Sequence, residues 1–118
     1  MELSVARVGS AGPGSGHRVL VDRLWPRGVR REGAPWEEWL RDVAPSDALR
    51  RWYGHAPDRF AAFSARYRAE LAAGAPALDR LLVLSSAGPV VLLTSSRDLE
   101  HSQAVVLAAF LRERAGQP

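Results

Sequence analysis

Two polar segments of this 118-residue chain carry the residue types that bind and transform small molecules. The first, residues 22–28, reads Asp-Arg-Leu-Trp-Pro-Arg-Gly, and the second, residues 94–98, reads Thr-Ser-Ser-Arg-Asp and is followed by His101. Arginine binds phosphate and carboxylate groups through paired N–H donors, whereas aspartate and histidine exchange protons. Together the two segments predict recognition of an anion, with acid–base chemistry beside it.

The first segment has a functional and a structural interpretation. Asp22 is a candidate catalytic acid or base, and Arg23 and Arg27 are candidates for holding a phosphate or carboxylate group. Trp25 would cover the apolar part of the ligand. A buried Asp–Arg pair that fixes the loop, with the tryptophan as its hydrophobic cover, would explain the same residues.

The second segment has two interpretations as well. Ser95 and Ser96 would receive an oxyanion at a helix N-terminus, with Arg97 beside them. The pattern Ser-x-x-Asp before an apolar stretch is also typical of helix capping, in which Asp98 takes part. His101 is either a catalytic acid or base or a structural hydrogen-bond donor.

Three short segments have the pattern of strands that would position these residues. Residues 3–8 alternate between apolar and polar side chains, residues 18–21 form a second strand, and residues 90–93 are entirely apolar, as in strands covered on both faces. Strands of that last kind usually belong to parallel sheets. If the second and third strands are parallel neighbours, both polar segments emerge at one edge of the sheet, where open α/β sheets bind ligands.

Helical patterns fill the rest of the chain. Their aromatic residues recur at helical spacing, which favours a core over a stacking platform for bases. The predicted fold is therefore α/β: one compact domain over residues 1–118, with a small, mostly parallel sheet of about three strands and about five helices. The helices are expected over residues 35–43, 46–54, 58–74, 76–87 and 98–114.

Composition narrows the chemistry. The chain has no cysteine, which excludes disulfides, thiolate nucleophiles and thiolate metal sites. Its sixteen basic residues are all arginine, so Schiff-base chemistry and a P-loop lysine are excluded, and a net charge of +3 is too small to indicate nucleic-acid binding by itself. The glycine-rich residues 9–16 precede a strand and not a helix, which favours a flexible connection over a phosphate loop.

Targeting and metal signals are weak. The sequence begins without a basic start and apolar leader, and no apolar stretch reaches the length of a membrane span, so we expect a soluble cytoplasmic protein with no membrane partner. No histidine and carboxylate spacing indicates a metal site. The cofactor and the oligomeric state are left open.

At the polar segments the chain resembles a known family, the small bacterial DUF488 proteins of the YeaO-like type. The resemblance covers nearly all of residues 18–111, and residues 21–28 match the family signature at every position. Weaker matches lie at residues 38–39 and 63–71. The resemblance implies a compact α/β fold and supplies no reaction.

The second family motif is only partly present, within residues 92–107. Members usually carry Ala-Lys-Asp and then His-Asn-His, whereas here Arg97 replaces the lysine, and Ser102 and Gln103 replace the asparagine and the second histidine. Only His101 of the histidine pair is retained. If the family site uses both histidines, half of it is missing from this chain.

These observations favour a protein that binds an anionic small molecule, a nucleotide or a sugar phosphate, at the two strand ends. Hydrolysis or group transfer assisted by Asp22 and His101 would be its reaction type if it is an enzyme. A nucleic-acid-binding or regulatory module without catalysis is the alternative, and a protein-interaction role for the aromatic helices is a third interpretation.

Overall fold

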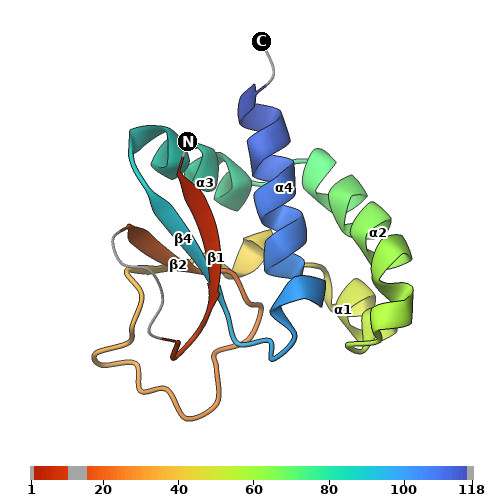
Figure 1. Cartoon of the computed structure of the whole chain (residues 1–118), viewed down its shortest axis with the longest axis horizontal. Coiled ribbons are helices and arrows are strands. Elements are labelled where there is room, and N and C mark those ends of the chain that lie inside the picture. The colour runs from red at the N-terminus through yellow and green to blue at the C-terminus, as the bar shows by residue number, and fades with distance from the viewer. Residues whose placement is uncertain (1, 11–15, 117–118) are drawn as a thin grey trace.

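A computed structural model describes residues 2–10 and 16–116. A fully parallel sheet of four strands lies at its centre, in the order β1-β4-β2-β3 (Figure 1). The strands are β1 Leu3–Arg7, β2 His17–Leu20, β3 Glu38–Trp39 and β4 Val90–Thr94. Part of the glycine-rich segment, residues 11–15, lies outside the described residues, so its interpretation as a flexible connection stays a prediction.

Four α-helices accompany the sheet in the described part of the chain, which confirms the α/β class with one strand more and one helix fewer than expected. They are α1 Asp47–Tyr53, α2 Phe60–Ala72, α3 Pro76–Ala87 and α4 Gln103–Gly116, and short 3-10 turns cover Arg41–Val43, Pro57–Arg59 and Leu99–His101. None of these helices has the length and apolar character that crossing a membrane requires.

Local signals explain where several helices begin and end. The Ser46 hydroxyl accepts a hydrogen bond from the Leu49 backbone N–H at 3.2 Å, which caps α1. The helix ends at Gly54, whose φ of 54° lies in the left-handed region that favours glycine. Pro76 occupies the first position of α3, where its missing N–H has no cost. These three signals are confirmed.

The prediction of a helix over residues 35–43 is wrong. The chain is extended there and forms the edge strand β3 beside β2, followed by a 3-10 turn. The Glu37 backbone N–H donates to Arg18 O at 2.9 Å, and the Leu40 N–H donates to Leu20 O at 3.0 Å. These sheet hydrogen bonds come from distant residues, and they outweigh the helical spacing of the apolar side chains.

The last helix also begins later than predicted, at Gln103 instead of Asp98. Asp98 precedes the 3-10 turn and makes no side-chain capping bond to it. The capping interpretation of the Ser-x-x-Asp pattern is therefore wrong, because these side chains have other partners, described below.

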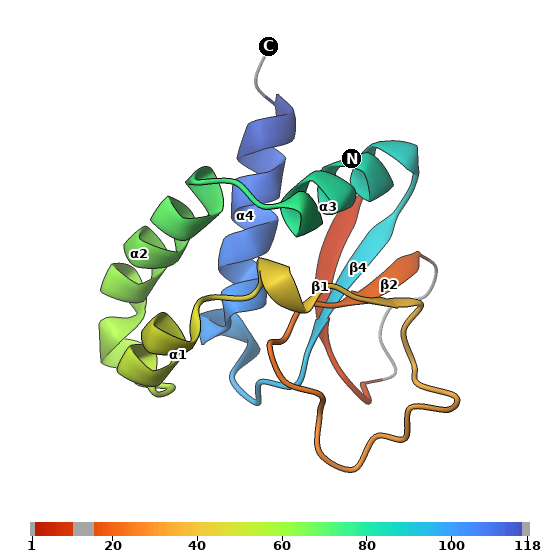
Figure 2. The same cartoon turned by 180° about the vertical axis from the view of Figure 1, so that it is seen from behind.

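The two faces of the sheet are covered differently. Val19, Val21, Val90 and Leu92 face the main core, which the helices complete. Leu20, Val91 and Leu93 face a smaller core completed by tryptophans from residues 21–40. Residues 21–37 contain no helix or strand and extend beyond the carboxyl ends of the strands (Figure 2). The prediction that the strand at 90–93 is covered on both faces is confirmed.

Candidate functional site

The two polar segments meet at the carboxyl edge of the sheet. Strands β2 and β4 are parallel neighbours, and the Val21 backbone N–H extends their pairing by donating to Leu93 O at 3.0 Å. Asp22 follows Val21, and Thr94 follows Leu93. The side chains at these two strand ends therefore share one edge of the sheet.

The Asp22 carboxylate is the centre of this edge. Its Oδ1 atom accepts from the Thr94 hydroxyl at 2.7 Å and from Gln103 Nε2 at 2.7 Å. Its Oδ2 atom accepts from the Ser95 backbone N–H at 2.8 Å and from the Ser95 hydroxyl at 2.6 Å. Asp22 is 8% exposed and Thr94 is 1% exposed. We call these four residues the carboxylate cradle.

The cradle changes the interpretation of Asp22. Both carboxylate oxygens already accept two hydrogen bonds, and all four donors are neutral, so the group ties β2, β4 and the start of α4 together. Gln103 was absent from the candidate residues because an amide carries no catalytic signal. Its replacement of a histidine in the family motif was the one hint that the position matters.

Arg23 does not pair with Asp22, so the structural expectation of a buried Asp–Arg pair is wrong. Its guanidinium turns toward the segment before α1, where Nη2 donates to Ala44 O at 3.2 Å and to Pro45 O at 3.1 Å. Its Nη1 atom lies 3.8 Å from Asp42 Oδ1. These contacts fix the loop to the helical layer and leave Arg23 poorly placed to hold a ligand.

Trp25 belongs to an aromatic cluster on the second face of the sheet. Its ring centroid lies 4.9 Å from that of Trp36 and 5.3 Å from that of Trp39, both in edge-to-face geometry. The Arg31 guanidinium lies over the Trp25 ring, 4.5 Å from its centroid. The Trp39 indole N–H donates to the backbone oxygen of Asp22 at 2.7 Å, which joins the cluster to the cradle.

Exposed groups are present in both polar segments. Arg27 and Arg97, one from each polar segment, are exposed, and neither makes a hydrogen bond or ion pair to any of the described residues. Ser96 donates through its backbone N–H to Thr94 Oγ1 at 3.2 Å, and its side chain is half-buried. Leu24 is 59% exposed, which is unusual for a large apolar side chain.

His101 lies in the 3-10 turn before α4, not one turn inside a helix as expected. Its Nδ1 atom is 2.7 Å from Asp98 Oδ2, and its ring packs edge-on against Phe60. The Tyr53 hydroxyl donates to the His101 backbone oxygen at 2.7 Å. Burial, and after it the charge of Asp98, raises the pKa of Tyr53, which keeps this donor protonated. Asp22 and His101 share no hydrogen bond.

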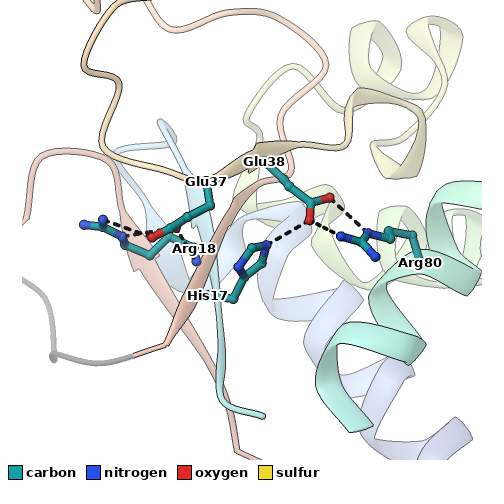
Figure 3. A network of polar contacts seen from close by, with 5 residues as sticks. All are labelled: His17, Arg18, Glu37, Glu38 and Arg80. Carbon is teal, nitrogen blue, oxygen red and sulfur yellow. Dashed lines mark hydrogen bonds and ion pairs between the residues drawn. The ribbon is translucent and has the colours of Figure 1, made fainter. Parts of the chain in front are cut away.

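A second polar network fixes the amino end of β2 and the edge strand β3 (Figure 3). Glu38 Oε2 accepts from Arg80 Nε at 3.2 Å, and Glu38 Oε1 lies 2.9 Å from His17 Nε2. The hydrogen bond from Arg80, and then the one from His17, holds the pKa of Glu38 below its usual value. The network links β2 and β3 to α3.

Metal ligands do not gather at either network. Within residues 2–10 and 16–116, no three His, Asp or Glu side chains have an arrangement that could hold a metal ion. The hydroxyl and indole donors of the two polar segments already have partners within the protein, whereas the Arg27 and Arg97 guanidinium groups have none among the described residues.

Comparison with known proteins identifies bacterial relatives of this chain and a family model that matches it. An uncharacterized protein of Mycobacterium tuberculosis, Rv3073c, is 45% identical over 102 residues, which cover 86% of each chain. The uncharacterized protein YeaO of Escherichia coli is 39% identical over 98 residues, which cover 82% of this chain and 84% of that protein. No solved structure matches the sequence significantly. A family model described as the inactive DUF488-N3 subclade matches residues 3–117, and the chain therefore belongs to the DUF488 family.

Proposed function

We propose that the protein binds an anionic small molecule, a nucleotide or a sugar phosphate, at the carboxyl edge of its sheet and does not catalyse a reaction there. The observation that carries this proposal is the pair of exposed arginines, Arg27 and Arg97. They follow two strands that the cradle joins, and no carboxylate among the described residues neutralises either one. Guanidinium groups in this position suit a phosphate or carboxylate ligand.

The other candidate residues take supporting roles in this proposal. The Ser96 hydroxyl, next to Arg97 in sequence, would have to leave its 3.4 Å hydrogen bond to Asp98 O to reach the anion, and Trp25 offers an apolar surface joined to the cradle through Trp39. Ser95 directs both its backbone and hydroxyl donors to Asp22, so it holds the loop and leaves the anion to the arginines.

Three observations support binding without catalysis. The Asp22 carboxylate accepts four hydrogen bonds, so it is not free to take a proton from a ligand without breaking one of them. Gln103, the residue that stands where family members usually have the second histidine, donates to that carboxylate but cannot exchange a proton near neutral pH. The matching family model is described as inactive.

A binding experiment tests the proposal. Isothermal titration with inorganic phosphate, ribose 5-phosphate and AMP at 150 mM salt should give saturable binding of at least one of them. We expect Arg27→Gln and Arg97→Gln each to weaken that binding by about tenfold, the effect of losing one charge-assisted contact. Arg114→Gln is the matched control, because this arginine lies in the last turn of α4, whose end points away from the carboxyl edge (Figure 1).

Two results would overturn the binding part of the proposal. One is binding that the control weakens as much as the two edge variants do. The other is affinity only for a short DNA duplex, with a steep decline as salt increases, which would favour the nucleic-acid alternative. Turnover of a bound phosphate ester that is abolished by His101→Ala would contradict the absence of catalysis, because Asp98 could orient His101 as a base.

A further inference from the structure

The aromatic cluster offers a surface that a phosphate alone would not use. Trp25 is only partly buried, although its ring contacts two other tryptophans and its indole N–H donates to Val29 O at 2.6 Å. These contacts hold the indole ring in one orientation. A rigid, partly exposed indole ring is a stacking surface for a planar group.

Arg31 marks where such a planar group would lie. Its guanidinium, itself planar, is over the Trp25 ring at 4.5 Å from the centroid and 5.9 Å from that of Trp39. The arginine is exposed and makes no ion pair to another described residue, so it can leave the ring at little cost. The place it occupies fits the stacked base of a nucleotide.

Hydrogen bonds connect the aromatic cluster to the carboxylate cradle. The Trp39 indole N–H donates to Asp22 O at 2.7 Å, and Asp22 binds the segment that carries Arg97. Leu24, which is 59% exposed, lies between the cradle residue and Trp25 in sequence and adds apolar surface at the same loop. A sugar phosphate is polar throughout and would leave these apolar groups uncovered.

We infer that the ligand is a nucleotide, with its phosphate at Arg27 and Arg97 and its base stacked on Trp25 in place of the Arg31 guanidinium. This inference rests on the proposed function, and it selects one of the two ligand classes named there. The base is recognised by stacking, so the site discriminates poorly among different bases.

The experiment compares three probes that separate the two halves of a nucleotide. AMP carries base and phosphate, ribose 5-phosphate lacks the base, and adenosine lacks the phosphate. We expect AMP to bind at least about tenfold more tightly than either of the others, since one stacked base contributes roughly that factor or more. Titrations followed by calorimetry and by quenching of tryptophan fluorescence measure the three constants.

A variant pair assigns the base to Trp25. Trp25→Phe keeps an aromatic ring in the cluster, and it should weaken AMP binding about fivefold, a larger factor than that by which it weakens ribose 5-phosphate binding. Trp52→Phe is the matched control. The Trp52 ring also lies under guanidinium groups, with its centroid 5.2 Å from Arg59 Cζ and 4.0 Å from Arg66 Cζ, but it belongs to α1 and not to the aromatic cluster. The control variant should leave both constants unchanged.

The possible outcomes distinguish failure of the nucleotide inference from failure of the proposed function. Equal binding of AMP and ribose 5-phosphate would overturn the nucleotide inference and leave the proposed function standing. Adenosine binding as tight as that of AMP would show that the phosphate is not recognised and would overturn both. Failure of all three probes and of inorganic phosphate to bind would also overturn both. The comparison of probes uses the wild-type protein, so it stands even if Trp25→Phe unfolds.

Discussion

Removal of the Asp22 carboxylate tests most directly whether the cradle stabilises the carboxyl edge of the sheet. Asp22→Ala deletes the acceptor of four hydrogen bonds and leaves the donors of Thr94, Ser95 and Gln103 facing an empty space. The variant should fold with reduced stability, because the strand ends and the start of α4 lose their common partner.

The expected size follows from which donors can reach water. The Thr94 hydroxyl is 1% exposed, so leaving it unpaired costs about 1–3 kcal/mol. Ser95 and Gln103 are less buried and regain hydrogen bonds to water, which limits the loss at each to about 1 kcal/mol. The total for Asp22→Ala is about 3–5 kcal/mol, a large share of the ordinary stability of a domain.

Asp22→Asn should cost less, about 1–2 kcal/mol. Its amide oxygen can still accept from Ser95, and the Gln103 amide can turn to accept from the new NH₂ group. The Thr94 hydroxyl loses an acceptor and becomes the main source of destabilisation. The free energy of unfolding should therefore fall in the order wild type, Asp22→Asn, Asp22→Ala, and this order tests the cradle as well as the size of either loss does.

Urea unfolding at pH 7, followed by tryptophan fluorescence, measures these differences. With a slope of about 2 kcal/mol per molar urea, the midpoint of Asp22→Ala should lie about 2 M below that of the wild type. Among the described residues, the exposed Asp98 side chain binds His101 alone. Asp98→Ala is therefore the control and should cost less than about 1 kcal/mol. An alanine midpoint within error of the control would refute the role assigned to the cradle.

Three further predictions concern other contacts. Gln103→Glu sets a second carboxylate against Asp22, so it should destabilise the protein at pH 7 and recover stability as the pH falls and the pair takes up a proton, as urea unfolding between pH 7 and pH 4 would reveal. Tyr67→Phe removes a buried hydroxyl that donates to Val43 O at 2.6 Å, and calorimetric melting should report a loss of about 1–3 kcal/mol, with an unchanged melting point contradicting it. Because the folded-state pKa of Glu38 is lowered, its contribution to stability is present above its ordinary pKa and is lost as the pH falls through the lowered value. The stability difference between wild type and Glu38→Gln in urea unfolding should therefore shrink between pH 5 and pH 3.

The meeting of the two polar segments was predictable because the strand at residues 90–93 is apolar at every position. That pattern indicates a strand buried on both faces, and such strands usually have parallel neighbours. Because parallel strands end at the same edge of a sheet, the residues that follow them meet there. The partners at that edge were not predictable. Gln103 reaches Asp22 across 81 positions of the chain, and nothing near either residue in sequence specifies the contact.

The helix expected over residues 35–43 illustrates a different failure. Trp36, Trp39, Leu40 and Val43 recur at helical spacing, but in the structure they divide between the two cores: the tryptophans face the smaller one, and Leu40 and Val43 face the main one. The apolar spacing predicts one face of a helix, whereas the segment forms an edge strand and a 3-10 turn whose side chains contact both cores. Only the pairing with β2 distinguishes the two.

The strand order has a consequence for how the chain folds. The central strand β4 pairs with β1, with Leu3 opposite Val90, and with β2, with His17 opposite Val90, so both of its neighbours precede it by about 70 residues or more. During synthesis, β1 and β2 have no central strand to join until the last quarter of the chain emerges. Non-local parallel pairing of this kind slows folding and leaves apolar strand edges open in the meantime. A chain that stops before residue 90 should therefore aggregate, although it contains most of the helices.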